Sequence, residues 1–246
     1  MRAKDADGNF RPDFLDIRWG RDYAEGSAWQ TSWSVLHDFA GLIKLHGSRE
    51  NFENKLIELC NQRPNFNVEG YGFEIHEMSE MAAIEFGQVA ISNQPSFHYP
   101  YLFSYIGKPW MATPLIKNLL TETFNDSPKG YPGDEDNGTM AAWYIFSSLG
   151  FYPVTAASNQ YVLGIPLWDK ARINLSSGQQ LTILAEPNAP QQVFVKQITF
   201  NDKKVNDTFI NHEELIKGGT LKYDLGIVPN PLKYTNEQLP YSLTEN

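Results

Sequence analysis

Three consecutive carboxylic acids, Asp134, Glu135 and Asp136, lie in the stretch GYPGDEDNG at residues 130–138. Glycine and proline around them indicate a turn or loop rather than the middle of a helix. The mutual repulsion of three carboxylates must be offset by a cation, a shared proton or hydrogen bonds from the backbone. The chemistry that such a loop offers is therefore proton transfer by a carboxylate or the binding of a cation.

The ordinary role of an acidic triplet is to cap a helix on an exposed turn. An apolar run, 140–146, follows at once, so Thr139 or Asn137 is expected to cap a helix whose N-terminus carries the acids. An EF-hand is excluded: a loop starting at Asp134 would have Gly138 at the fifth position and Ile145 at the twelfth, where oxygen ligands are required.

Two other stretches combine groups that transfer protons. EGSAWQTSWSVLHD places Glu25 at a predicted helix start, where a glutamate usually compensates the helix dipole. GFEIHEMSEM places His76 and Glu77 side by side near the start of another helix, where such a pair usually lies on the surface. Zinc chemistry of the H-E-x-x-H type would need a second histidine at position 80, which is Glu80, so the sequence disfavours zinc.

Apolar residues at spacings of three and four predict the helices that must position these groups. The expected helices span 28–46, 51–62, 74–90, 100–105, 114–123 and 139–149. After Pro153, short β-branched runs predict strands at 161–166, 171–176, 181–187, 193–200 and 219–226. Helices followed by strands favour separate layers, with a boundary that divides the chain into 1–152 and an all-β unit at 153–246.

The composition excludes several classes of protein. The 246 residues, 41% apolar and 13% aromatic, are enough for a sizeable core. A net charge of −9 provides no basic surface for nucleic acid, and no window has the roughly 20 apolar residues of a membrane span. Cys60 is the only cysteine, so no disulfide forms within the chain. A neutral or polar small molecule is the expected partner.

Aromatic side chains are frequent in the polar loops between the predicted helices. A helical barrel with a carbohydrate site at one mouth has this appearance, because sugars need flat apolar faces beside hydrogen-bonding groups. Most of these aromatics are nevertheless expected in the core. They are Trp19, Tyr23, Trp29, Trp33, Phe97, Tyr101, Trp110, Tyr131 and Trp143.

Four ordered motifs resemble glycoside hydrolase family 92, whose members are exo-acting, calcium-dependent α-mannosidases. They are EGSAWQTSWSVLHDFAGLI, GFEIHEMSEMAA, NQPSFHYPYLFSYIGKPW and GYPGDEDNGTMAAWYIFSSLGFYP, followed by YVLGIPLW. The resemblance implies the second half of an (α/α)₆ barrel followed by a small β-sandwich-like unit. Since family members are longer, it also implies a C-terminal fragment that lacks the N-terminal domain of a secreted or periplasmic parent protein.

The resemblance assigns roles to the acidic residues. Family members invert the anomeric centre: one acid protonates the leaving oxygen, and a carboxylate about 6.5–9.5 Å away activates water. Glu25 matches the general acid, and Asp134 and Asp136 match the candidate base pair. On an extended segment both aspartates would face one pocket while Glu135 turns away. Trp29, which follows the acid, is expected to contact the sugar.

The resemblance also implies a metal and a substrate. Ca²⁺ would contact the mannose hydroxyls, and its candidate ligands are Asn93, Gln94, Asp136 and Asn137, with Gln94 also expected to contact the sugar. His76 and Glu77 match the pair that contacts the leaving-group sugar in α-1,2-mannosidases, so terminal α-1,2-linked mannose of a mannose-rich oligosaccharide or N-glycan is the expected substrate.

Two other interpretations remain open. One is a catalytically inactive glycan-binding fragment, because half a barrel cannot close and leaves apolar helical faces exposed. The other is a different helical-barrel glycosidase or a phosphorylase. A phosphorylase would need a basic anion pocket, and Lys129 is the only basic residue near the acidic loop.

Overall fold

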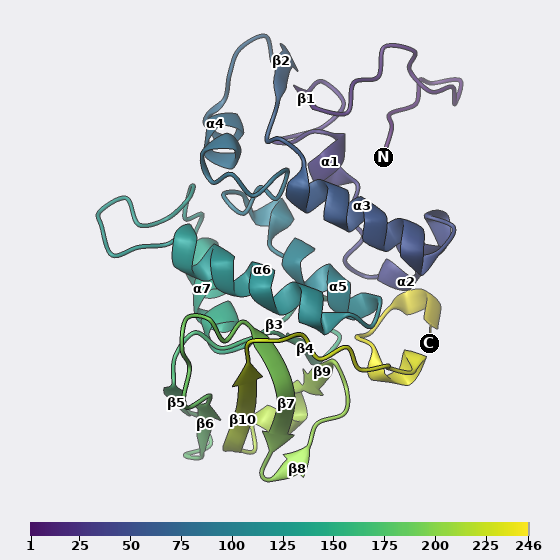
Figure 1. The fold of residues 1–246 in the computed structure, drawn as a ribbon. Coiled ribbons are helices and arrows are strands. Elements are labelled where there is room, and N and C mark those ends of the chain that lie inside the picture. The colour runs from purple at the N-terminus through teal and green to yellow at the C-terminus, as the bar shows by residue number, and fades with distance from the viewer. Residues whose placement is uncertain (246) are drawn as a thin grey trace.

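Helices occupy the first part of the chain and strands most of the second (Figure 1) in the computed structural model, which describes residues 1–245. The order predicted from the sequence is therefore confirmed. The helices are α1 (Ala28–Thr31), α2 (Phe39–Leu45), α3 (Arg49–Asn61), α4 (His76–Ala83), α5 (Leu102–Tyr105), α6 (Pro109–Glu122), α7 (Thr139–Ser148) and α8 (His212–Leu215).

The single helix predicted over 28–46 is wrong, because α1 and α2 are separated by an irregular segment. Ser27 caps α1 in a reciprocal capping box with Gln30, and Asp38 caps α2 by accepting the Gly41 N–H. Trp33, between the two helices, is fully buried. The apolar pattern was thus continuous, but a strong capping residue starts a second helix inside it.

The helix predicted over 74–90 is also too long, because α4 ends at Ala83. Glu85 and Gly87 both have positive φ, which an α-helix does not allow. A Cβ on Gly87 would lie 2.4 Å from the carbonyl oxygen of Leu59 at the end of α3. Because glycine has no Cβ, the backbone at residue 87 can pass in contact with the C-terminal end of α3 on its way to residues 92–94.

The second part contains most of the strands. One sheet has the order β5-β6-β10-β7-β8, in which β10 runs parallel to β6 and antiparallel to β7. A second sheet, β3-β4-β9, is antiparallel, and a small parallel pair, β1-β2, lies in the helical part. The strands are β1 (Arg18–Gly20), β2 (Asn67–Gly70), β3 (Phe151–Tyr152), β4 (Gln160–Leu163), β5 (Lys170–Asn174), β6 (Gln180–Leu184), β7 (Phe194–Phe200), β8 (Lys203–Lys204), β9 (Phe209–Asn211) and β10 (Gly219–Gly226).

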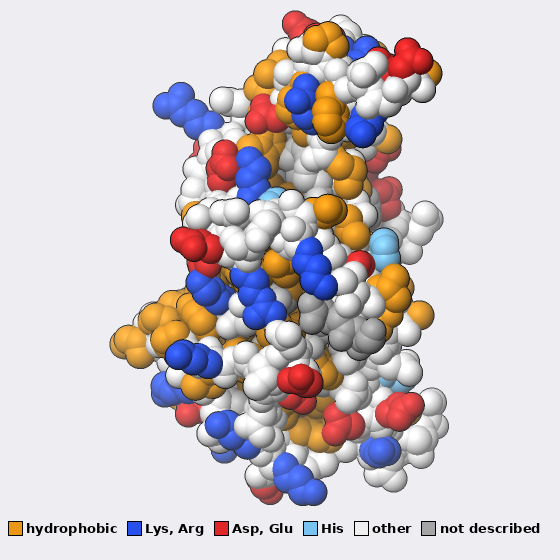
Figure 2. Space-filling model, turned by 90° about the vertical axis from the view of Figure 1, so that its right-hand side faces the viewer, with side chains coloured by type: hydrophobic (Ala, Val, Ile, Leu, Met, Phe, Trp, Pro, Cys, Tyr) orange, Lys and Arg blue, Asp and Glu red, His pale blue; other side chains and the backbone are white. Residues whose placement is uncertain are grey.

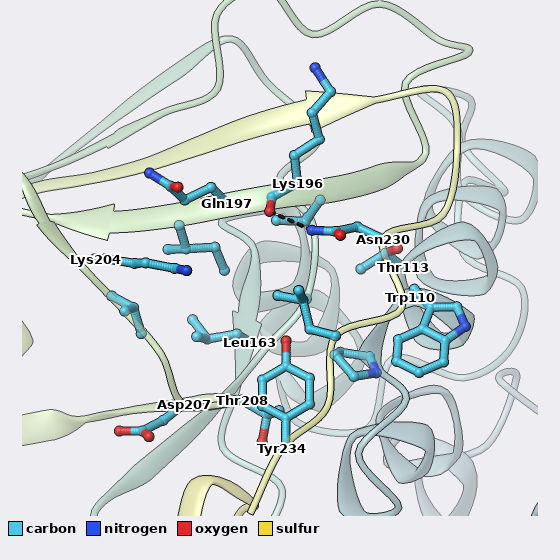
Figure 3. A pocket seen from close by; sticks show the side chains of 16 residues that line it. Trp110, Thr113, Leu163, Lys196, Gln197, Lys204, Asp207, Thr208, Asn230 and Tyr234 are labelled. Carbon is cyan, nitrogen blue, oxygen red and sulfur yellow. Dashed lines mark hydrogen bonds between the residues drawn. The ribbon is translucent and has the colours of Figure 1, made fainter.

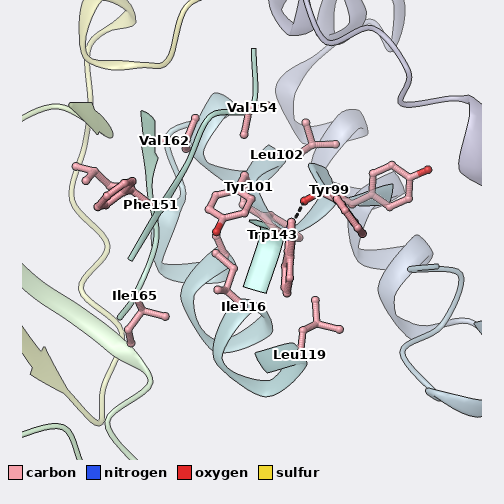
Figure 4. Packing of buried hydrophobic residues seen from close by; sticks show 14 of the residues in the cluster. Tyr99, Tyr101, Leu102, Ile116, Leu119, Trp143, Phe151, Val154, Val162 and Ile165 are labelled. Carbon is pink, nitrogen blue, oxygen red and sulfur yellow. Dashed lines mark hydrogen bonds between the residues drawn. The ribbon is translucent and has the colours of Figure 1, made fainter. Parts of the chain in front are cut away.

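The main hydrophobic core contains residues from both parts of the chain. Figure 4 shows Trp143 of α7 and Ile116 of α6 in the same cluster as Phe151 and Val162 of the β3-β4-β9 sheet. The Trp143 indole N–H donates to the Phe97 carbonyl at 2.9 Å. The division into domains 1–152 and 153–246 stays a prediction, and the apolar cluster is continuous across it.

The C-terminal tail returns from the sheets to the helical part, where it ends beside α2 (Figure 1). Its attachment point is Asp38, the capping residue of α2. The Asp38 carboxylate accepts hydrogen bonds from the Ser242 hydroxyl at 2.8 Å, the Thr244 N–H at 3.0 Å and the Thr244 hydroxyl. Burial raises the pKa of Asp38, but the hydrogen bonds from Thr244, Ser242 and the backbone outweigh burial and hold it well below its ordinary value.

Asp38→Asn is expected to destabilise the fold by about 1–2 kcal/mol, because the hydrogen bonds from Ser242 and Thr244 lose their charged acceptor and one of the two acceptor oxygens becomes an NH₂ group. The folded pKa is depressed, so this stabilisation is present above the ordinary pKa of 3.8 and is lost as the pH falls below it. Urea unfolding at pH 7 and pH 3 measures both effects, with the exposed Asp126→Asn as control. Equal stability of the two variants at pH 7 would contradict the attachment.

Charged and apolar side chains are mixed at the surface. Figure 2, which faces the side of the C-terminal end, shows acidic, basic and apolar side chains interspersed. Leu45 at the end of α2 is 86% exposed, and Ile227 beyond β10 is 64% exposed. Among residues 1–245, no helix combines the length and the apolar character that crossing a bilayer requires.

Candidate active site

The acidic loop leads directly into α7, as predicted, but a different residue caps the helix. The Glu135 carboxylate accepts hydrogen bonds from the Gly138 N–H and, at 3.0 Å, from the Ala141 N–H. The prediction of Thr139 or Asn137 as the cap is wrong, since the Thr139 hydroxyl instead donates to the Asp136 carbonyl at 2.6 Å. The Glu135 carboxylate therefore stabilises the N-terminus of α7, and the two neighbouring aspartates do not share this contact.

The segment that carries the two aspartates is a turn rather than the extended segment expected. Asp136 has φ +49° and Asn137 φ +60°, both in the left-handed region. The alternation rule for extended chains therefore does not decide where their side chains point. Asp134, Asp136 and Asn137 are all exposed, so their oxygen atoms are accessible to a ligand.

Glu25 lies in the loop before α1 rather than in its first turn. Its φ is +46°, an unusual conformation for a residue with a side chain. Two long-range contacts hold it there: its N–H donates to the Tyr71 phenol oxygen at 2.9 Å, and its carboxylate accepts from Asn93 Nδ2 at 3.3 Å. The backbone strain is therefore stabilised by residues more than forty positions away.

Asn93 and Gln94 connect the Glu25 loop to the acidic loop. Asn93 is 5% exposed and contacts Glu25, while Gln94 Nε2 donates to the Asp134 carbonyl at 3.3 Å. Gly133 explains the close approach, because a Cβ there would lie 2.1 Å from the Ser92 carbonyl oxygen. The two loops that supply the predicted acid and the predicted base thus meet at one pair of neighbouring residues.

His76, the first residue of α4, is surrounded by three carboxylates. Its Nδ1 lies 3.0 Å from Glu80 Oε1, and its Nε2 lies 3.5 Å from Glu77 Oε1 and 3.9 Å from Asp134 Oδ2. The hydrogen bond to Glu80 raises the pKa of His76 against the opposing effect of burial, and the nearby negative charges raise it further. The pKa of Glu80 is also raised, because burial outweighs its ion pair with His76.

Trp29 is not brought to this group. Its side chain is 4% exposed and belongs to the main core cluster, with Lys55 Nζ 3.7 Å from the ring centroid. It borders a cavity of about 490 Å³ together with Trp33 and His46, and no other predicted site residue lines that cavity. The structure therefore places the Trp29 ring in the core beside α3 rather than at an exposed position in the Glu25 loop.

The four predicted calcium ligands all offer oxygen donors, which is what Ca²⁺ requires. Asn93 is the poorest of them, because its Oδ1 already accepts the Gln94 N–H at 2.9 Å and its Nδ2 donates to Glu25. Asp136 and Asn137 are exposed in the left-handed turn, and Gln94 is half-buried beside it. The set therefore fits a calcium ion in donor type, with Asn93 as a support rather than a ligand.

A separate cavity of about 60 Å³ lies between α6 and the β-rich part (Figure 3). Figure 3 shows Trp110 and Tyr234 on one side of it and Lys204, Asp207 and Gln197 on the other. None of its lining residues is a predicted site residue.

Comparison with known families decides the classification of the chain. The model of the glycosyl hydrolase family 92 catalytic domain matches residues 1–227. The chain belongs to this family. The resemblance inferred from the sequence motifs is therefore confirmed.

Solved family 92 structures share the fold of this chain. The inverting mannosidase BT2199 from Bacteroides thetaiotaomicron is 38% identical, with a TM-score of 0.85 over 99% of this chain. The α-mannosidase BT3965 from the same species, in complex with mannoimidazole, is 26% identical with a TM-score of 0.88. The family 92 chain covers 33% and 32% of these two structures, so it spans about a third of their length.

A curated relative is described as an uncharacterized secreted glycosidase of Arthroderma benhamiae. It is 26% identical over 205 residues, which are 82% of this chain and 23% of that protein. The family 92 chain is thus similar to part of a secreted glycosidase and to part of two solved mannosidases.

The sequence did not predict two residues of the candidate site. Tyr71 fixes the backbone of Glu25, but no local pattern connects two residues so far apart in the chain. Glu80 pairs with His76, and the spacing of four did signal a contact on one helical face. The zinc motif needs a histidine at position 80, but a carboxylate at the same spacing can also pair with His76.

Proposed function

We propose that this protein hydrolyses terminal α-1,2-linked mannose from mannose-rich glycans by a calcium-dependent inverting mechanism. The helical part would then be the second half of an (α/α)₆ barrel, followed by a small β-sandwich-like unit, in a longer secreted or periplasmic protein. The name of the secreted fungal relative supports that location, and the names of the solved mannosidases support the substrate.

The observation that carries this proposal is the meeting of two loops at Asn93 and Gln94. Asn93 contacts the Glu25 carboxylate at 3.3 Å, and the next residue contacts the Asp134 backbone at 3.3 Å. Inverting hydrolysis needs an acid and a base on opposite sides of one sugar, with room for water between them. Two carboxylate loops that contact one central pair of residues support that arrangement.

The protein groups have distinct tasks in this mechanism. Glu25 donates its proton to the glycosidic oxygen as the bond to the anomeric carbon breaks. Asp134 or Asp136 removes a proton from the water that attacks the opposite face of that carbon. His76 and Glu77 lie at the edge of the group, beside Asp134, where they would hydrogen-bond the leaving-group sugar. Gln94 would orient the cleaved mannose, and Asn93 would position Glu25.

Calcium would be held by Asp136, Asn137 and the side-chain oxygen of Gln94. When bound, the ion would contact mannose hydroxyls and favour the flattened ring of the transition state. The protein groups that transfer protons are the carboxylates described above.

Release of mannose from α-1,2-mannobiose tests the proposal directly. We expect turnover by the longest protein that contains this chain, with β-mannose as the first product seen by NMR, because one displacement inverts the α configuration. Removing calcium with EGTA is expected to abolish most turnover, and added Ca²⁺ to restore it. Binding of mannobiose with no release of mannose would instead favour a glycan-binding protein without catalysis.

A further inference from the structure

We propose that His76, Glu80 and Asp134 form a binding site for a divalent transition metal, separate from the calcium ligands. One ligand atom from each residue lies within 4.8 Å of those of the other two. His76 and Glu80 are four positions apart on α4, so they project from one face of the helix. Asp134 reaches the pair from the loop before α7.

The three side chains must rearrange to bring their ligand atoms, which lie within 4.8 Å of one another, to the spacing of a metal site. Ligand bonds of about 2.0–2.2 Å place tetrahedral ligands roughly 3.5 Å apart. The Glu80 carboxylate lies 3.0 Å from Nδ1 of His76, whereas the Asp134 carboxylate lies 3.9 Å from Nε2. One ion binds a single ring nitrogen, so the imidazole and the Asp134 side chain must rotate to bring one nitrogen to both carboxylates. The Asp134 side chain is 70% exposed and that of His76 is 57% exposed, which leaves both room to rotate, while the Glu80 side chain on α4 is 25% exposed. A fourth position toward solvent is left for water or a substrate hydroxyl.

The charge around His76 is unbalanced without a cation. Glu77, Glu80 and Asp134 face the imidazole, so even a protonated His76 leaves two negative charges uncompensated. Among the described residues, no lysine or arginine forms an ion pair with any of these carboxylates. The second oxygen of Glu80 is buried and accepts no hydrogen bond within the same part of the chain. A bound cation would satisfy both the charge and this oxygen.

The donor set selects the kind of metal. Imidazole nitrogen with two carboxylates suits Zn²⁺ and its neighbours among the transition metals, whereas Ca²⁺ takes oxygen ligands alone. The sequence disfavoured zinc because position 80 is not histidine. The structure supplies the third ligand from a different loop, fifty-four positions after Glu80.

Zinc binding is tested by calorimetry on tag-free protein, titrated with ZnCl₂ without substrate. We expect one ion per chain with a dissociation constant of about 1–10 μM. His76→Ala and Glu80→Gln should each weaken binding at least about tenfold, as loss of a ligand does. His37→Ala, which removes another exposed histidine, should bind as the original protein does. Equal binding by all variants, or no saturable binding below about 1 mM, would overturn the site.

Calcium competition distinguishes this site from the proposed calcium site. A tenfold excess of Ca²⁺ should leave the zinc isotherm unchanged, and displacement of zinc by Ca²⁺ would overturn the proposal. If the proposed function holds, zinc should also inhibit mannose release, because the ion occupies the candidate base Asp134. The inhibition experiment depends on the proposed function, whereas the calorimetry does not. Zinc binding without any mannose release would therefore contradict the proposed function and leave the zinc site standing.

Discussion

Glu25→Gln is expected to lower kcat/KM for α-1,2-mannobiose by a factor of about 100 or more, the usual contribution of a general acid. Glutamine keeps the shape of the side chain and can still contact Asn93, but it has no proton to give to the leaving oxygen. The loop geometry should survive, since the contact to Tyr71 is made by the backbone N–H of residue 25.

Initial rates of mannose release measure this loss, with Glu122→Gln as the matched control on an exposed glutamate of α6. Circular dichroism and the melting temperature should be the same for both variants. A Glu25→Gln protein that turns over mannobiose at the original rate would remove this residue from the mechanism.

Asp134→Asn and Asp136→Asn are each expected to reduce turnover by a factor of about 100 or more, because a general base must be ionised. Asparagine at position 134 preserves the backbone carbonyl that accepts the Gln94 hydrogen bond. The change therefore tests the carboxylate and not the connection between the loops. Glu135→Gln, in contrast, changes the cap of α7 and should act mainly on stability.

Pre-steady-state and steady-state rates of mannose release, with Asp126→Asn as control, separate a loss of catalysis from a loss of stability. The Asp134→Asn variant should still bind mannose, since binding does not require an ionised base, whereas Asp136→Asn should also weaken the proposed calcium site. Full activity in both variants would show that the water is activated by a group elsewhere in the protein.

The sequence pattern predicted where helices and strands occur more accurately than it predicted the residues at which they begin and end. Around α7, the glycine-rich loop followed by an apolar run located the helix to within one residue at its C-terminal end. The cap was not predictable, because Glu135 reaches forward to the N–H groups of Gly138 and Ala141 from outside the helix. The order of residues in the loop does not show which of the three adjacent acids accepts hydrogen bonds from the N-terminus of α7.

The helix predicted over 28–46 failed for a similar reason. Its apolar spacing continues through Trp33 and Phe39, so the apolar pattern alone does not separate α1 from α2. Asp38 begins α2 as its N-cap, and Ser242 and Thr244, about two hundred positions later, donate hydrogen bonds to its carboxylate. A window of neighbouring residues contains no information on such a contact.

The candidate site was only partly accessible to local reasoning. Residue types identified Glu25, His76 and the acidic loop as groups that can transfer protons, but each had an ordinary structural explanation. The family resemblance supplied their roles, and the contacts through Asn93 and Gln94 supply their spatial connection. Trp29 shows the limit of the approach, because an aromatic residue next to a candidate acid was directed into the core.

The central claim is that Glu25 acts on the leaving group and Asp134 with Asp136 on the water. Hydrolysis of α-mannosyl fluoride separates these tasks, because fluoride leaves without a proton while the attacking water still needs a base. Glu25→Gln should hydrolyse the fluoride within about threefold of the original rate, and Asp134→Asn and Asp136→Asn should not. An equal loss for Glu25→Gln on the fluoride and on mannobiose would contradict the assignment.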